Sequence, residues 1–276
     1  ELFTGNCLMV IPLLEREISE GSGSLTDRSC LTVEGIVAFA DCLSTEDVEE
    51  VLEQQIRCNM AIAEEGLRHD YGANIGKTLL RGHEEDLSYR MRAYAAAASD
   101  ARMNGCEMPV VIVSGSGNQG ITASVPVWKY GQLMGADEEK ILRAVCLSDL
   151  ITIHQKTGIG RLSAYCGAVS AGVGAGCGIA WLRGADYDGI CHTLENAVAM
   201  ISGCICDGAK ASCASKIAMG VDCGILGYDM YRNGDNFRSG DGIVGNDVED
   251  TIRHVGVLAT EGMRETDRVI LKIMTE

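Results

Sequence analysis

Three cysteines lie within ten residues in the segment CICDGAKASC, at positions 204 to 213. Two of them, Cys206 and Cys213, are seven residues apart, which is about 10.5 Å along the axis if one helix holds both. That separation strains a mononuclear site, whereas a cuboidal iron–sulfur cluster is wider and usually takes thiolate ligands. If Asp207 and Gly208 begin a helix, its free N–H groups would lower the pKa of both thiols. The segment therefore predicts two ligands of a cluster.

A third ligand must come from elsewhere in the chain, and spacing alone does not choose it. Cys166 begins a stretch of small residues, and the competing candidates are Cys177, Cys191, Cys204 and Cys223. Zinc is the main alternative metal, although its tetrahedral sites usually show tighter C-x-x-C pairs. The alternative without metal is that all these thiols are packed in the core, where free cysteine is often found.

A second stretch that could carry chemistry is SGSGNQG, residues 114 to 120. Its glycines alternate with polar residues directly before a predicted helix start. Such a loop can turn several backbone N–H groups toward an anion, and the helix terminus adds about half a positive charge. The loop thus predicts a site for a substrate carboxylate, with a plain flexible connection between helices as the alternative.

Charge and cysteine content narrow the function classes. The formal net charge of −16 repels phosphate backbones and anionic lipid, so we expect neither nucleic-acid nor membrane-surface binding. Thirteen cysteines, an odd number without a secretory signal pattern, argue against a disulfide framework. We therefore expect reduced thiols, a cytoplasmic location and a small-molecule substrate.

The elements that must position these residues are predicted to be helices. Prolines are few, and alternating runs of β-branched and aromatic residues are nearly absent. The uncharged stretch 162–182 is long enough to span a bilayer, but its small residues favour a buried helix instead. The prediction is an all-α, multi-helix bundle around this central Gly/Ala-rich buried helix. Helices are expected at about 45–68, 85–103, 119–134, 137–156, 160–182, 188–204, 208–222 and 244–274.

The connections between these helices are short, except for residues 224–243, whose glycines and polar residues suggest an exposed or ligand-covering loop. No repeat or low-complexity linker is visible. We expect one helical, cluster-binding catalytic domain over residues 1–276, with residues 1–30 as a loosely attached lead-in.

Several segments are specific enough to carry a family resemblance. They are ASDARM (98–103), SGSGNQGI (114–121), RLSAYCGA (161–168), ICDGAKASCA (205–214), GNDVE (245–249) and ETDR (265–268). From about residue 25 to its end, the chain resembles the L-cysteine desulfidase family, which is related to the α chain of iron–sulfur L-serine dehydratases. In that family three cysteines hold an oxygen-sensitive [4Fe-4S] cluster, and Cys166, Cys206 and Cys213 match their spacing. The resemblance assigns these three as ligands and leaves the other ten thiols to packing.

The resemblance also implies a reaction. Three protein ligands leave one iron open to act as a Lewis acid, and the family cleaves L-cysteine to pyruvate, ammonia and sulfide without pyridoxal phosphate. The implied substrate-binding residues are Ser114, Ser116, Asn118 and Gln119 as donors to the carboxylate, with Lys210 and Arg161 adding positive charge. Taken alone, Lys210 and Arg161 fit exposed cations better. His154, at a predicted helix end, fits a structural histidine better than an acid or base.

One departure from the family bears on activity. Its members carry a long additional N-terminal region with a Gly-Cys-Thr-Glu-Pro-like motif, whose cysteine is thought to be the base. Nothing in residues 1–30 matches it, and Cys7 lacks the motif's context. The catalytic base is therefore unassigned. The chain is expected to be the cluster-binding portion of a larger enzyme, either a homo-oligomer or one completed by a separate N-terminal domain.

Three alternatives to a cysteine-cleaving lyase remain open from the sequence. The first is L-serine dehydration on the same cluster. The second is a non-catalytic iron–sulfur or thiol sensor, in which the cluster changes the fold and no substrate is turned over. The third is a structural domain stabilised by zinc.

Overall fold

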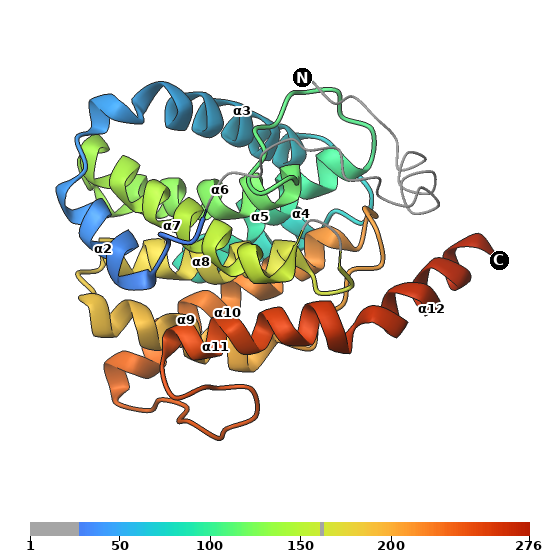
Figure 1. Ribbon diagram of the computed structural model, residues 1–276. Coiled ribbons are helices and arrows are strands. Elements are labelled where there is room, and N and C mark those ends of the chain that lie inside the picture. Colours follow the sequence, from blue (N-terminus) through green and yellow to red (C-terminus); the bar gives the residue numbers. More distant parts are fainter. Residues whose placement is uncertain (1–27, 161–162) are drawn as a thin grey trace.

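The structure is a computed structural model that describes residues 28–160 and 163–276. Within these ranges all regular elements are helical, and strand-like pairing is limited to two isolated bridges, which confirms the all-α prediction (Figure 1). The α-helices are α2 (Val33–Cys42), α3 (Glu49–Arg68), α4 (Ile75–Leu80), α5 (Leu87–Met103), α6 (Gly117–Met134), α7 (Glu138–Ile159), α8 (Gly167–Leu182), α9 (Tyr187–Ile201), α10 (Cys213–Asn233), α11 (Val248–Val257) and α12 (Arg264–Thr275). A short 3₁₀ turn (η2, Thr45–Asp47) and a π-turn (η3, Leu258–Gly262) complete them.

Helix α8 forms the centre of the bundle and packs against α6, α7, α9 and α10. Its small residues allow neighbouring backbones to come close. A methyl group at Gly176 would lie 2.3 Å from the Cα of Gly224 on α10, so only glycine fits there. Every residue from Ala168 to Ala180 is buried. The prediction of a central Gly/Ala-rich helix is therefore confirmed.

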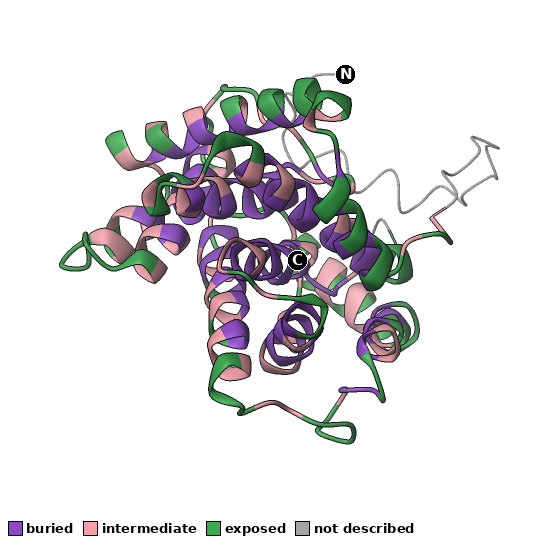
Figure 2. Cartoon of the chain, turned by 90° about the vertical axis from the view of Figure 1, so that its left-hand side faces the viewer, coloured by how far each residue is buried: buried purple, intermediate pink, exposed green. Residues whose placement is uncertain are grey.

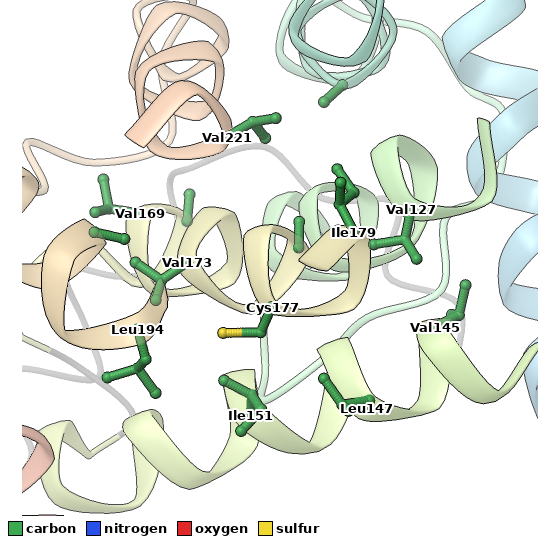
Figure 3. Packing of buried hydrophobic residues seen from close by; sticks show 14 of the residues in the cluster. Val127, Val145, Leu147, Ile151, Val169, Val173, Cys177, Ile179, Leu194 and Val221 are labelled. Carbon is green, nitrogen blue, oxygen red and sulfur yellow. The ribbon is translucent and has the colours of Figure 1, made fainter. Parts of the chain in front are cut away.

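The apolar contacts of α8 involve aliphatic side chains from its neighbours. Figure 3 shows the side chain of Cys177 on α8 pointing between Ile151 of α7 and Leu194 of α9. Cys177 is fully buried in this cluster and is a packing thiol. The outer helices bury one face and expose the other, as the purple and green sides in Figure 2 show.

None of the helices in the part of the chain that the structure describes is both long enough and apolar enough to cross a bilayer.

Two predicted boundaries are wrong in a way that matters for the site. The helix expected at 208–222 begins only at Cys213 and continues to Asn233. Gly208 has a φ of +94° and belongs to a turn, so it does not start a helix. Gly224 and Gly227, which suggested a loop, are instead points of close helix approach. The irregular connection is therefore shorter than the predicted 224–243, since it starts only at Gly234 and ends before α11.

Two further predicted helices also differ from the structure. The one expected at 160–182 starts at Gly167, with Cys166 as its N-cap residue. The one expected at 244–274 is divided into α11 and α12 by the π-turn η3. Both breaks lie close to the cysteine segment, as described below.

Candidate functional site

A short antiparallel pairing gathers three of the cysteines. Tyr165 and Ile205 form an isolated bridge, which is flanked by hydrogen bonds from Cys166 N to Cys204 O (3.3 Å) and from Cys206 N to Ala164 O (2.6 Å). In extended chain, alternate residues point to the same face, and directly opposed residues share a face. Cys166 is paired directly with Cys204 across the two segments. The side chains of Cys166, Cys204 and Cys206 therefore point to the same face of the pairing.

Cys213 joins this group from the first turn of α10. Its thiol donates to the carbonyl oxygen of Gly208 (3.5 Å), across the turn that connects it to Cys206. Burial raises the pKa of Cys213, and the negative charges of Cys166 and Cys206 raise it further. The three cysteines that the resemblance assigns as ligands therefore lie in the same region of the structure, in the paired segments and at the start of α10.

Cys204 is a fourth thiol in the same group, which the sequence left among several competitors. A hydrogen bond with Cys166 lowers the pKa of Cys204 to about 7, although burial opposes this effect. The same hydrogen bond raises the pKa of Cys166. Burial also raises the pKa of Cys206. The expectation that helix N–H groups would lower the pKa of Cys206 and Cys213 is wrong, because α10 starts later than predicted and burial dominates at both thiols.

The donor set at this place has the chemistry of an iron–sulfur site. Soft thiolate ligands select iron–sulfur clusters, zinc or copper(I), and cuboidal clusters are held by cysteine thiolates. In the described ranges, no three His, Cys, Asp or Glu side chains converge on the position of a single metal ion. The sulfur donors are thus of the type that holds a cluster, but in the described residues they do not form an assembled metal site.

Contacts from the C-terminal part of the chain hold the first cysteine segment in place. Ser163 Oγ donates to Ala259 O in the π-turn (3.0 Å) and accepts from Tyr165 N (3.0 Å). Asp267 on α12 accepts a hydrogen bond from the backbone of Ala164. The π-turn and α12 thus supply groups that fix the residues directly before Cys166.

A partly buried ion pair fixes the second cysteine segment. Lys216 on α10 pairs with Asp207 and donates to Ile205 O (3.0 Å). Burial is the largest single influence on the pKa of Lys216 and would lower it. The hydrogen bond and the charge of Asp207 together outweigh burial, so the pKa of Lys216 is raised. Lys216 therefore ties the turn between Cys206 and Cys213 to the first turns of α10.

The predicted anion loop forms a tight turn that leads into α6. Val113 and Ser116 exchange backbone hydrogen bonds of 3.1 and 3.2 Å, while Ser114 and Gly115 have φ angles of +49° and +90°. Ser114 and Ser116 are half-buried, and Ser116 is the N-cap residue of α6 without a side-chain cap. The first N–H groups of α6 therefore have no capping side chain.

Asn118 and Gln119, both buried in the first turn of α6, link this loop to the cysteines. Asn118 Oδ1 accepts from Arg102 Nη1 at 3.1 Å. A methyl group at Gly167 would lie 2.6 Å from Gln119 Nε2, so the Gln119 amide lies against the residue after Cys166. Gln119 Oε1 is buried and has no hydrogen-bond partner. The first turn of α6 therefore contacts the residue that follows Cys166.

The two predicted cations of the site do not take the places expected of them. Lys210 is exposed, and only its carbonyl group takes part, by accepting from Cys213 N (2.9 Å). Arg161 lies outside the described residues. His154 has a structural contact as expected, since its Nε2 lies 2.7 Å from Glu249 Oε2, while the other oxygen of Glu249 accepts from Val33 N at 2.7 Å.

Two other cations, which sequence reasoning missed, have pKa values on which the charges of the thiols act. Burial lowers the pKa of Arg102, and the charge of Cys213 opposes this effect. Burial likewise lowers the pKa of Lys156, and the charges of Cys206 and Cys166 oppose it. Arg102 lies within the ASDARM motif, which carries part of the family resemblance but to which the sequence alone assigned no role. Lys156 had no signal, because an isolated lysine near a helix end is normally exposed.

The chain is similar over most of its length to several known proteins. The chain is 55% identical to a UPF0597 protein of Desulfitobacterium hafniense and 52% identical to one of Lachnoclostridium phytofermentans, with 94% of this chain aligned in both cases. A UPF0597 protein of Bacteroides fragilis is 38% identical, with 95% of this chain aligned. The chain spans only 60 to 62% of the length of these relatives. No solved structure matches it.

The match to a family profile covers nearly the whole chain. The profile of the serine dehydratase alpha chain matches residues 17–272, a range that contains all four grouped cysteines, the loop at 114–120 and Asp267. This chain belongs to the serine dehydratase alpha chain family.

Proposed function

We propose that this chain is the cluster-binding portion of an iron–sulfur lyase that cleaves L-cysteine to pyruvate, ammonia and sulfide by α,β-elimination. The observation that supports the proposal is that the segments carrying Cys166, Cys206 and Cys213 are neighbours, and that Gly167, directly after Cys166, contacts Gln119 in the first turn of α6. The family supports a serine-dehydratase-like lyase, and the resemblance to cysteine desulfidases supports the finer assignment.

In this proposal Cys166, Cys206 and Cys213 would hold a [4Fe-4S] cluster. When bound through three protein ligands, the cluster supplies a Lewis-acidic iron that can accept the leaving group of the substrate. The chain's own contribution is to fix the thiols through the pairing of Tyr165 with Ile205 and through the ion pair of Lys216 with Asp207.

The first turn of α6 is proposed to hold the substrate carboxylate. Its N–H groups are not capped by a side chain, and a helix N-terminus favours an anion. Ser114 and Ser116 supply hydroxyl groups, and Gln119 supplies an amide beside Cys166. Asn118 Oδ1 accepts a hydrogen bond from Arg102, whose guanidinium would add positive charge near the proposed carboxylate site.

Elimination also requires a base to remove the α-proton, and we assign no residue of this chain to that role. The relatives are longer than this chain, so we propose that the remainder of the protein, on the same or a second chain, supplies the base. The isolated portion is then expected to bind the cluster and to turn over substrate poorly.

L-Serine dehydration on the same cluster is the second candidate, and the family description favours it. Both reactions remove the α-proton and expel the β-substituent, so they need the same carboxylate site. They differ in the leaving group, which is a soft sulfide in one case and a hard hydroxide in the other.

A non-catalytic sensor is the third candidate, and Cys204 is the observation that favours it. Its thiol hydrogen-bonds to Cys166 within the same group. A cluster held by four cysteines would have no open iron, and it would then act through its gain or loss.

The test uses the full-length protein, reconstituted anaerobically with iron and sulfide. Sulfide and pyruvate are measured with L-cysteine alone, with L-serine alone, and with both in competition. The proposal expects equal amounts of sulfide and pyruvate from L-cysteine. Pyruvate from L-serine with none from L-cysteine would support the dehydratase instead, and absence of all products from a loaded protein would contradict both lyases.

A further inference from the structure

An open groove runs along α3, between this helix and parts of α6 and α7. Helix α3 lies at the top of the bundle in Figure 1, above the other two helices. The volume of the groove is about 920 Å³. Its floor consists of apolar side chains from all three helices, namely Ile56 and Met60 of α3, Trp128 of α6 and Leu142 of α7. Concave surfaces with such a floor are typical of grooves that accept the apolar face of a helix.

The rim of this groove carries unpaired negative charge. Only Arg57 among its described lining residues is a cation, whereas five are glutamates, namely Glu46, Glu49, Glu50, Glu53 and Glu138. In the part of the chain that the structure describes, none of the five glutamates forms an ion pair. Three of them lie in first helical turns, where carboxylates favour the helix dipole, but Glu53 lies in the second turn of α3. A cationic partner would neutralise this charge.

The groove has the length of a short helix. Its lining residues on α3 extend from Glu49 to Met60, which corresponds to about 16 Å along the helix axis. A partner helix of about three turns has the same length. Such a helix can lay an aliphatic stripe on the floor of the groove, while lysines or arginines that flank the stripe face the glutamates of the rim.

The charge of the chain disfavours a second copy of it as the partner. Each copy carries a formal net charge of −16, so a second copy would bring further negative charge to the glutamates of the rim. Like charges that face each other across an interface oppose association. The charge on the groove therefore fits a different, basic protein.

The position of the groove disfavours the remainder of the protein as the occupant. Leu142 in the groove and Gln155 are both on α7, about 20 Å apart along its axis. Gln155 donates to Ser170 O (3.1 Å) near the start of α8, which follows Cys166. The groove is thus at the opposite end of α7 from the cysteines. The segment that supplies the base has to reach the cysteines, a step that rests on the proposed function, and it therefore leaves the groove free.

We propose that this groove is a docking site for a separate protein, which inserts a basic amphipathic helix with lysines or arginines along both edges of an aliphatic stripe. Burial of the stripe against the apolar floor supplies affinity. The glutamates select a cationic helix and fix its orientation. Docking at this place needs neither iron nor substrate.

The test measures binding of a model peptide to the full-length protein without iron. The fluorescein-labelled peptide has about 14 residues, with leucines on one helical face and lysines beside them. Fluorescence anisotropy gives its Kd. Glu53→Lys should weaken binding about fivefold or more, because it places like charges together. Glu85→Lys is the matched control, since it makes the same change of net charge at an exposed residue outside the groove, and it should leave Kd unchanged. A peptide with glutamate in place of every lysine should not bind.

Arg57→Glu should have the opposite effect from Glu53→Lys. It removes the cation of the rim and should tighten binding of the lysine peptide several-fold. Arg68→Glu, at an exposed position on the same helix outside the groove, is its control and should change Kd little. Equal effects at positions 57 and 68, or at positions 53 and 85, would show that only the net charge matters and would overturn the proposal.

Photo-crosslinking locates the bound peptide. A version with benzoylphenylalanine in place of a central leucine should form crosslinks within residues 49–60 and 128–142 of the protein. Crosslinks elsewhere would overturn the proposal, and so would absence of binding, which includes the case in which another part of the protein fills the groove. A mass that halves in Glu53→Lys, measured by light scattering, would overturn it in favour of a second copy.

These measurements use neither a cluster nor turnover. Specific binding of the peptide to a protein that produces neither sulfide nor pyruvate would leave this proposal standing and contradict only the proposed lyase. Absence of binding to a protein that turns over L-cysteine would contradict only the docking site. The two failures are therefore distinguishable.

Discussion

The amide nitrogen of Gln119 would lie 2.6 Å from a methyl group at Gly167, so these two residues join the first turns of α6 and α8 in direct contact. Gly167 directly follows Cys166, the proposed cluster ligand. The contact therefore places the proposed carboxylate site and the thiols side by side, although 47 residues separate Gln119 from Cys166 in sequence.

Gly167→Ala is expected to displace Gln119 and to weaken substrate binding. Because the obstructing group is the end of a flexible side chain, the free energy of unfolding should change by less than about 1 kcal/mol. The KM for L-cysteine should rise several-fold while the iron content stays at the wild-type level. Steady-state kinetics and iron analysis on the reconstituted full-length protein measure both quantities.

Gly203→Ala is the matched control for this substitution, because a methyl group at Gly203 meets no atom within 4 Å. It should leave KM unchanged. Combining Gly167→Ala with Gln119→Ala should add nothing to the effect of Gln119→Ala, since the displaced group is already absent. Additive effects of the two substitutions would show that Gly167 does not act through Gln119.

The sequence predicted the centre of this fold from composition. A long run of glycine, alanine and serine without charge fits only where other backbones come close, and α8 has that position. Cys206 and Cys213 were found through their spacing, and Cys166 through a family resemblance. Each of these features is local or is carried by a motif.

Cys204 and Lys156 show what the sequence could not reveal. Cys204 joins the thiol group because residues 204–206 are extended, whereas a helix was predicted up to residue 204. Lys156 is buried because α7 packs closely against its neighbouring helices, and such packing depends on the tertiary structure. Misreading Gly208 as a helix start had the same origin, since its positive φ is set by the turn between two cysteines.

Cys166→Ser is expected to abolish retention of the cluster under anaerobic conditions. Serine removes the one thiolate that the first segment contributes opposite Cys204, and two remaining ligands should not hold a cluster. Iron and sulfide content and the visible absorption of the reconstituted protein measure retention.

Cys58→Ser and Cys146→Ser serve as controls, because both thiols lie on helices away from the cysteine group, on α3 and α7. They should bind iron like the wild type. Similar losses of iron in all three variants would contradict the ligand assignment.

Cys204→Ser distinguishes a cluster with three protein ligands from one with four. With three ligands, the variant should retain iron and sulfide at the wild-type stoichiometry, because Cys204 only hydrogen-bonds to Cys166. Adding L-cysteine to the reconstituted variant should still change the visible absorption spectrum of its cluster. If Cys204→Ser instead loses the cluster as completely as Cys166→Ser does, all four thiols are ligands and the sensor is favoured over the lyase.

Asp149 on α7 is expected to make the protein less stable as the pH rises from about 4 to about 7. Burial raises the pKa of Asp149 to about 7, and the hydrogen bond from Gln55 Nε2 (3.0 Å) only partly opposes this. Because the folded pKa exceeds the unfolded value of about 3.9, the folded state binds more protons in this window, and its stability falls with increasing pH. The full effect is on the order of 4 kcal/mol.

Asp149→Asn keeps an acceptor for Gln55 and removes the titrating group, so the variant should gain stability over the wild type at pH 8 and show a flatter profile. Urea unfolding at pH 5 and pH 8 measures this, with Asp188→Asn at an exposed position as the control. Asp100, whose pKa burial raises to about 6, contributes in the same direction and should leave a residual slope in Asp149→Asn. A wild-type protein that becomes more stable between pH 5 and pH 8 would contradict the assignment of both carboxyl groups.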